Sequence, residues 1–170
     1  MAVVGGKHSG KTTTIENLTI ELRCRGYHVG AIKEMVRIPA LDTPGKETDR
    51  YAQAGAEIIV AVPRNETVVF LKRRLELGEI IPFFRGLDFV LLEGFEDKRA
   101  LQKVIVAKTI MEVQSYLDES TIAVSGLLAE SAAKAWNFNV PLLSCRTQIK
   151  QLTDLVEQKT LNTIPNPINK

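Results

Sequence analysis

Residues 5–12 read Gly-Gly-Lys-His-Ser-Gly-Lys-Thr, which fits the pattern G-x-x-x-x-G-K-T. The apolar run Met1–Val4 precedes them, and Lys11–Arg25, with apolar residues at helical spacing, follows. Between a strand and a helix this pattern indicates a phosphate-binding loop, because its glycines let consecutive backbone N–H groups curl around a phosphate. The N-terminus of the helix adds partial positive charge. The chain is therefore expected to bind a nucleoside triphosphate.

The loop also supplies side chains for the nucleotide. Lys11 can reach the β- and γ-phosphates, and the Thr12 hydroxyl is a ligand that Mg²⁺ accepts. His8 is expected to point to solvent. Lys7 is expected to do the same, although it could act as a second cation that helps to neutralise the phosphates. The candidate nucleotide-binding residues are Gly5, Gly6, Lys7, His8, Ser9, Gly10, Lys11, Thr12 and Thr13.

A carboxylate on a neighbouring strand is needed to hold Mg²⁺ and its waters, and residues 88–94 have the required form. Glu93 ends this apolar strand and is followed by Gly94, so it lies where open α/β sheets bind ligands. Asp88 begins the strand, about 16 Å away, and is too far from the metal. Glu93 is thus a candidate metal ligand, and Lys11 and Glu93 are the candidate catalytic residues.

The segment after the second strand offers a further acid. Lys33 ends that strand at the same edge of the sheet, and Asp42 stands in the turn-like stretch Asp42–Lys46. An acid from this region can complete the metal shell of a nucleotide site. The competing interpretation of Asp42, which the sequence supports equally well, is a solvent-exposed cap for the helix that starts at Glu47.

Apolar runs alternate with helical segments along the chain, which predicts an α/β fold of the P-loop NTPase type with three α/β/α layers and a mostly parallel sheet. One nucleotide-binding domain is expected over residues 1–160, with a loosely held tail at 161–170. After the first strand, the expected strands are Val29–Lys33, Glu57–Val62, Asp88–Glu93, Lys103–Ala107, Thr121–Ser125 and Val140–Ser144. The expected helices are Lys11–Arg25, Glu47–Gly55, Lys72–Phe84, Ile110–Leu117, Leu127–Trp136 and Thr147–Gln158.

One pair of apolar runs departs from the parallel pattern. Ile58–Val62 and Thr67–Leu71 are separated by four turn-forming residues, which predicts an antiparallel hairpin inserted into the sheet. The second run is strongly β-prone and can form an exposed edge, which proteins usually cover. Pairing with a second copy of the chain and burial within the monomer explain it equally well.

Composition excludes several classes of function. A net charge of +2, from 22 basic and 20 acidic residues, argues against a nucleic-acid binder. The two cysteines and two histidines form no zinc, disulfide or multi-histidine pattern. No apolar run approaches the length of a membrane span, and the N-terminus leads directly into a strand without a signal peptide, so a cytoplasmic location is expected. Without an Asn-Lys-x-Asp motif, the residues alone do not decide between guanine and adenine.

The first 105 or so residues resemble the molybdopterin-guanine dinucleotide biosynthesis protein B family (MobB). The loop alone is shared by many families, but its combination with a D-x-P-G-K-[DE]-[ST] block, an A-G-A turn and an E-G-F motif is more specific. The matching segments are Val4–Thr13, Gly26–Lys33, Asp42–Thr48, Arg50, Ala54–Ala56, Asp88 and Glu93–Phe95.

This resemblance implies a protein that binds GTP and Mg²⁺ and hydrolyses GTP weakly. It implies that Gly10, Lys11, Thr12 and Thr13 contact the nucleotide, with Asp42 and Glu93 near the metal. It also implies a homodimer formed through the hairpin at residues 58–71. The implied partner is the guanylyltransferase that joins GMP to molybdopterin, and direct binding of molybdopterin is left open.

Three other functions compete with this one. A P-loop small-molecule kinase or ligase using ATP would need a substrate clamp and a lid over the γ-phosphate. A metal-insertion GTPase would need clustered cysteines and histidines, which this chain lacks. A nucleotide-gated adaptor would act by switching its partner surface and differs little from the first interpretation.

Overall fold

The computed structural model describes residues 1–35, 42–98, 100–131 and 136–161. The chain forms two compact units: the sheet unit, residues 1–34 and 86–170, and the hairpin unit, residues 35–85. The expectation of one domain over residues 1–160 stays a prediction. Of the expected tail, residues 162–170 lie outside the described residues.

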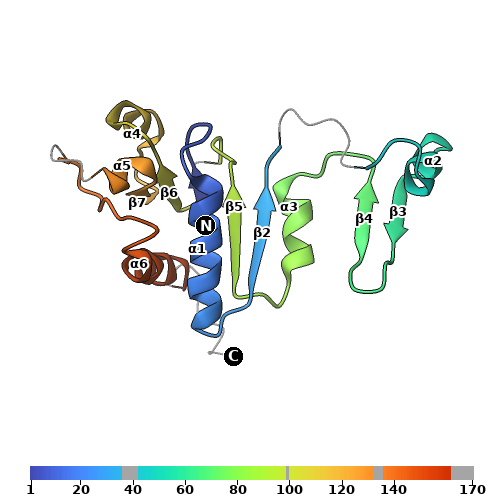
Figure 1. Cartoon of the computed structure of the whole chain (residues 1–170), viewed down its shortest axis with the longest axis horizontal. Coiled ribbons are helices and arrows are strands. Elements are labelled where there is room, and N and C mark those ends of the chain that lie inside the picture. Colours follow the sequence, from blue (N-terminus) through green and yellow to red (C-terminus); the bar gives the residue numbers. More distant parts are fainter. Residues whose placement is uncertain (36–41, 99, 132–135, 162–170) are drawn as a thin grey trace. The chain divides into compact units, whose positions relative to one another are not determined.

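The sheet unit contains five parallel strands in the order β2-β5-β1-β6-β7 (Figure 1). The mostly parallel α/β prediction is therefore confirmed. The run at residues 140–144 forms no strand, only a single bridge between Leu142 and Val124. The strands are β1 (Ala2–Val4), β2 (Val29–Lys33), β5 (Phe89–Glu93), β6 (Lys103–Val106) and β7 (Thr121–Ser125).

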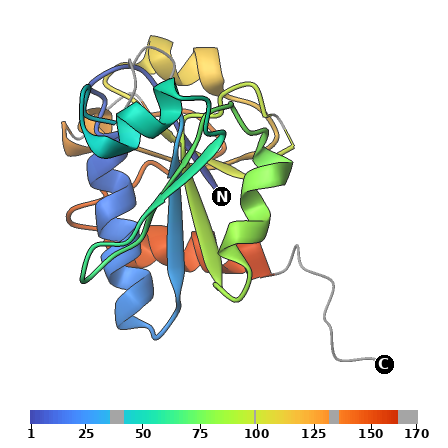
Figure 2. The same ribbon diagram turned by 90° about the vertical axis from the view of Figure 1, so that its right-hand side faces the viewer.

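Helices cover both faces of this sheet. Helices α1 (Lys11–Cys24) and α6 (Ile149–Leu161) share one apolar cluster with Val3, whereas α4 (Ile110–Tyr116) and α5 (Leu127–Glu130) share another with Val4. Successive residues of a strand face opposite sides, so strands covered on both faces are apolar throughout. Figure 2 shows α1 running alongside the strands. Of the helix expected at residues 127–136, α5 forms the first turn, and residues 132–135 lie outside the described residues.

Helix α1 fixes the position of the loop that precedes it. Its buried residues Ile15, Leu18 and Leu22 recur at helical spacing and pack on the sheet. At its end, the backbone N–H of Tyr27 donates to the carbonyl of Leu22 at 3.1 Å, which satisfies one of the last carbonyls. The first residue of the helix, Lys11, therefore lies directly beyond the carboxyl end of β1.

The hairpin unit contains α2 (Glu47–Gln53), β3 (Ile58–Ala61), β4 (Val68–Leu71), α3 (Leu77–Ile80) and the 3₁₀ turn η1 (Ile81–Phe84). Strands β3 and β4 pair antiparallel, as predicted, but they form a two-stranded sheet of their own. The predicted antiparallel hairpin is therefore confirmed, and within the described residues it is separate from the parallel sheet.

The long helix expected at residues 72–84 is instead α3 followed by η1. Glu76 and Glu79 form a reciprocal capping box, which starts α3 only at Leu77. Pro82 lies in the first turn of η1, and its missing N–H prevents an α-helix from continuing through it. None of the helices in the described part of the chain combines the length and apolarity that crossing a bilayer requires.

Candidate functional site

Three residues of the loop at 5–10 have positive φ angles, which suits a tight glycine-rich turn: Gly5, His8 and Gly10. Gly5 has a φ of +144°, and a Cβ there would overlap the carbonyl oxygen of Val106 in the adjacent strand β6. Only glycine fits this close approach. His8 adopts a left-handed φ of 58°, which is uncommon for a residue with a side chain, and it is exposed, as expected.

The Lys11 side chain folds back onto the loop. Its ammonium donates to the carbonyl oxygens of Gly5 and Gly6 at 2.6 and 2.7 Å. These two bonds hold the positive charge against the same turn whose N–H groups are expected to surround a phosphate. Lys11 is thus placed to contact a phosphate bound by the loop.

Thr12 and Glu93 come together from distant parts of the sequence. The Thr12 hydroxyl lies 3.2 Å from each carboxylate oxygen of Glu93, whose side chain is only 12% exposed. Strand β5 lies next to β1, so its last residue ends beside the start of α1. Hydroxyl and carboxylate oxygens are the donors that Mg²⁺ prefers, so this pair fits the predicted metal ligands.

Lys33 joins this pair from the other side. Its ammonium lies 3.0 Å from the Glu93 carboxylate, and the register of β2 and β5 places the two residues opposite each other. The sequence placed Lys33 at this edge of the sheet but gave it no role. The missing information was the adjacency of β2 and β5, which depends on long-range strand pairing.

A cavity of about 540 Å³ connects these groups. This volume falls within the range of about 300–1,000 Å³ typical of small-molecule sites. Three lysines and one carboxylate line it, so it suits a polyanion. The lining residues are Lys7, His8, Ser9, Gly10, Lys11, Thr12, Thr13, Lys33 and Glu93. The structure therefore brings all the predicted loop residues from 7 to 13 together with Glu93.

Ser9 adds an unexpected feature to the loop. Ser9 is 1% exposed, and its hydroxyl has no hydrogen-bond partner within the described residues. Buried polar atoms are usually paired, and exceptions gather at functional sites. Ser9 was predicted to bind the nucleotide only as part of the motif.

Asp42 belongs to the hairpin unit, where it has its own partners. Its carboxylate accepts hydrogen bonds from the Thr43 backbone at 2.9 Å and the Thr48 hydroxyl at 2.8 Å. Lys72 lies 3.5 Å from the other oxygen. Asp42 is 8% exposed, and the N-cap of α2 is Lys46, so the interpretation as a solvent-exposed cap was wrong. Its role as a metal ligand stays a prediction.

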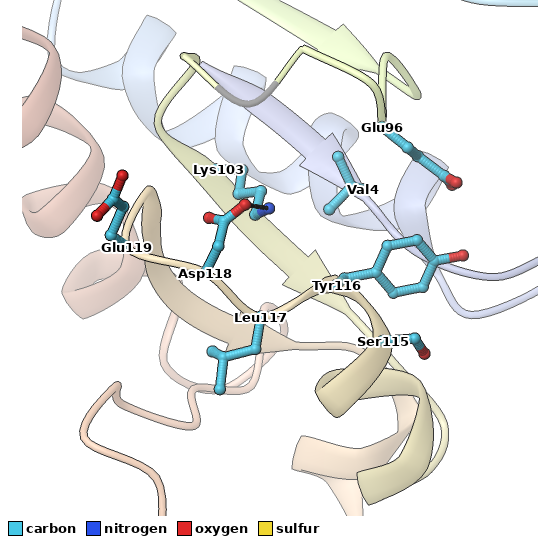
Figure 3. A pocket seen from close by; sticks show the side chains of 8 residues that line it. All are labelled: Val4, Glu96, Lys103, Ser115, Tyr116, Leu117, Asp118 and Glu119. Atoms are coloured by element: carbon cyan, nitrogen blue, oxygen red, sulfur yellow. Dashed lines mark hydrogen bonds and ion pairs between the residues drawn. The ribbon is translucent and has the colours of Figure 1, made fainter.

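A second cavity of about 380 Å³ lies beside the C-terminal end of α4 (Figure 3). Lys103 and Asp118 form an ion pair of 2.6 Å in it, and Glu96 and Glu119 add further negative charge. Burial and the nearby carboxylates raise the pKa of Tyr116. Its excess of carboxylates repels a polyanion, so the cavity at the loop is the better candidate for the predicted triphosphate site. Among the residues the structure describes, no group of three or more His, Cys, Asp or Glu side chains is arranged to hold a metal ion.

Comparison with known proteins extends this assignment. A family model described as "Molybdopterin guanine dinucleotide synthesis protein B" (MobB) matches residues 1–126. A "Probable molybdopterin-guanine dinucleotide biosynthesis adapter protein" of Bacillus subtilis is 31% identical over 126 residues, 72% of each chain. A "Putative molybdopterin-guanine dinucleotide biosynthesis adapter protein" of Methanocaldococcus jannaschii is 34% identical over 113 residues, covering 65% of this chain and 46% of that protein.

Solved structures show the same fold. The crystal structure of Bacillus subtilis MobB matches with a TM-score of 0.74 and 24% identity, covering 93% of this chain and 95% of that one. A MobB homolog from Bacillus stearothermophilus matches with a TM-score of 0.69 and 21% identity, covering 95% and 97%. The family model spans the loop, Lys33 and Glu93, and it covers well over half of the chain. The resemblance inferred from the motifs is confirmed: the chain belongs to the MobB family.

Proposed function

We propose that this chain binds GTP with Mg²⁺ in the cavity at the loop and acts as an adapter in the synthesis of molybdopterin guanine dinucleotide. The observation that carries the nucleotide site is the Thr12–Glu93 contact of 3.2 Å beside the loop that holds Lys11. The adapter role rests on the family and on the names of its relatives. The choice of GTP over ATP rests on the family resemblance.

The residues of the cavity divide the work of binding. The loop N–H groups and the Lys11 ammonium hold the β- and γ-phosphates, while Thr12 and Glu93 are the groups that would hold Mg²⁺. When bound, the metal neutralises charge that develops on the phosphates during hydrolysis. Glu93 is the only carboxylate among the residues that line the cavity, and it already contacts Thr12 and Lys33. Because this carboxylate already has partners, we expect hydrolysis of the bound nucleotide to be slow.

Calorimetry tests this proposal directly. We expect GTP with Mg²⁺ to bind the wild-type protein and Lys11→Ala to abolish binding, because the variant loses the ammonium that faces the phosphates. At a GTP concentration of 100 Kd, binding should stabilise the fold by roughly 2.7 kcal/mol. Absence of binding by any purine triphosphate would overturn the proposal. Rapid ATP consumption with a small-molecule acceptor would instead favour the kinase or ligase.

The adapter role needs a second experiment. Purified guanylyltransferase should bind this protein more tightly with GTP than without, and Lys11→Ala should remove that difference. Partner binding that ignores the nucleotide would exclude a nucleotide switch. We propose that the protein carries out this adapter role in the cytoplasm, as the family role suggests.

We further propose that two copies pair through the β3–β4 hairpin. Val60 and Val69 are paired across the strands, are 52% and 53% exposed, and share a face with Ile58, which is 62% exposed. An exposed apolar strand pair of this kind is usually covered. Val60→Lys should shift the protein toward the monomer in analytical ultracentrifugation. Ile20→Lys, which alters a residue of α1 that is 61% exposed, is the matched control and should leave the mass unchanged.

Asp42 is proposed as a further metal ligand. Asp42→Asn should then weaken the Mg²⁺ dependence of GTP binding, as Thr12→Val should. A variant that loses stability but keeps the wild-type Mg²⁺ dependence would confine Asp42 to its contacts with Thr48 and Lys72.

A further inference from the structure

Lys33 carries a positive charge into the nucleotide cavity from a strand that the loop motif does not include. Its side chain is 48% exposed, and its ammonium contacts Glu93 at 3.0 Å. The Lys33 side of this ion pair is open to solvent, whereas the Glu93 side chain is only 12% exposed and needs a cation beside it. The site thus contains a cation that can leave Glu93 when another cation takes its place.

The distances place this cation beside the metal ligands. Thr12 and Lys33 both contact Oε1 of Glu93, at 3.2 and 3.0 Å, so the Lys33 ammonium lies at most about 6.2 Å from the Thr12 hydroxyl. In phosphate-loop sites the loop and its lysine hold the β- and γ-phosphates, and the loop threonine and the strand carboxylate would hold a metal that neutralises their charge. We therefore expect the terminal phosphate of a bound nucleotide to lie nearest to Thr12, Glu93 and Lys33.

Two of the three lysines that line the cavity, Lys11 and Lys33, differ in what holds them. Lys11 is bound to the carbonyls of Gly5 and Gly6 within the loop, whereas Lys33 is bound only to Glu93 among the contacts described. The lysine stem is flexible, and its ammonium acts as a compact point charge. A dication at Glu93 competes with Lys33 for the carboxylate, and a phosphate oxygen offers the ammonium a new partner.

The backbone around Lys33 is fixed, so the exchange involves its side chain. Next to it, the Glu34 N–H donates to the carbonyl of Glu93 at 2.9 Å, and the Glu34 carboxylate accepts from the N–H of Phe95 at 3.0 Å. These bonds hold the ends of β2 and β5 together. The Lys33 ammonium can therefore exchange one partner for another within a cavity whose strands stay in place.

We propose that Lys33 is the residue that distinguishes a nucleoside triphosphate from a diphosphate at this site, by leaving Glu93 and binding the terminal phosphate. This inference rests on the proposed nucleotide site and adds a residue and a specificity to it. A diphosphate lacks the group that Lys33 binds, so the lysine contributes to affinity only when the third phosphate is present.

Isothermal titration calorimetry with a non-hydrolysable GTP analogue and with GDP, both with Mg²⁺, tests this role. Lys33→Met should lower the affinity for the triphosphate analogue at least tenfold and change the affinity for GDP less than threefold. Lys33→Arg keeps the charge and should restore most of the preference for the triphosphate. Lys98→Met removes another ion-paired lysine, 39% exposed and outside the cavity, and should leave both affinities unchanged.

The ratio of the two affinities separates this role from a structural one. If Lys33 only held Glu93 in place, its removal would weaken the binding of both nucleotides alike. An equal loss of affinity for the triphosphate and for GDP would therefore overturn the inference. Unchanged affinities in Lys33→Met would also overturn it. If the wild-type protein bound neither nucleotide, the proposed function itself would fail, which is a different result. Urea unfolding of each variant confirms that the fold is intact.

Discussion

Gly126, between β7 and α5, is the position where an added methyl group should damage both the fold and the proposed nucleotide site. Its φ of +91° and ψ of −161° lie in a region that is essentially restricted to glycine. A Cβ there would lie 2.7 Å from Cγ1 of Val106, 2.8 Å from the carbonyl oxygen of Ser9 and 2.9 Å from the backbone nitrogen of Ala107. Two of these neighbours are backbone atoms, which cannot rotate away.

The cost of Gly126→Ala has two parts. The unfavourable backbone conformation costs about 1–3 kcal/mol, and the crowding costs about 1–3 kcal/mol more. We therefore expect the free energy of unfolding to fall by about 2–6 kcal/mol. Because Ser9 belongs to the predicted phosphate-binding loop, relief of the crowding should also displace that loop and lower the affinity for GTP at least tenfold.

Gly26→Ala is the matched control. Gly26 has nearly the same φ, +92°, but nothing lies within 4 Å of a Cβ built on it. Its alanine variant should lose only about 1–2 kcal/mol from the left-handed backbone and should bind GTP like the wild type. Urea unfolding monitored by circular dichroism and calorimetry with GTP provide the measurements. Equal losses of stability in the two variants, or full GTP affinity in folded Gly126→Ala, would refute the reasoning.

Two further predictions concern stability. Leu18→Ala should lower the free energy of urea unfolding by about 2–5 kcal/mol, because Leu18 is fully buried between α1 and the sheet. Ile20 is 61% exposed on the same helix, so Ile20→Ala should change the stability by no more than about 0.5 kcal/mol. Similar losses in both variants would contradict the packing described. Burial alone would raise the pKa of Asp118, but hydrogen bonds from Lys103 and Ser120 hold it below its ordinary value. A lowered pKa in the folded state stabilises the protein above the unfolded-state pKa of about 3.9, and this contribution is lost as the pH falls through the folded-state value. Asp118→Asn should therefore lower the free energy of unfolding by about 1–3 kcal/mol at pH 7, less than for a fully buried pair because the Asp118 side chain is 33% exposed. It should also reduce the loss of stability that the wild type shows below pH 4. An unchanged pH dependence in this range would show that the pair does not titrate with folding.

The sequence predicted the loop and its flanking strand and helix because these features are local. The spacing of glycines, lysine and threonine in residues 5–12 is dictated by the backbone turn that a phosphate needs. Glu93 was found by the same kind of argument, since the end of an apolar strand followed by glycine marks the ligand edge of the sheet. Near-continuous apolar runs likewise predicted a sheet covered on both faces.

Local patterns also misled where competing interactions prevailed. The run at residues 140–144 is as apolar as a strand, yet it makes only one bridge to β7. The β3–β4 hairpin was predicted from its turn, but its turn says nothing about which sheet it joins. Asp42 was assigned to the metal or to an exposed cap, and its burial against Thr48 and Lys72 could not be foreseen, because these contacts span up to thirty residues.

The sequence by itself determined the parallel α/β core and predicted a phosphate-binding loop and a carboxylate for a metal, since each follows from short-range spacing and hydrophobic pattern. Only the tertiary structure decided that β5 lies between β1 and β2, and therefore that Glu93 contacts Thr12 on one side and Lys33 on the other. Strand order arises from the packing of helices over distant strands, and no periodicity within a single strand encodes it.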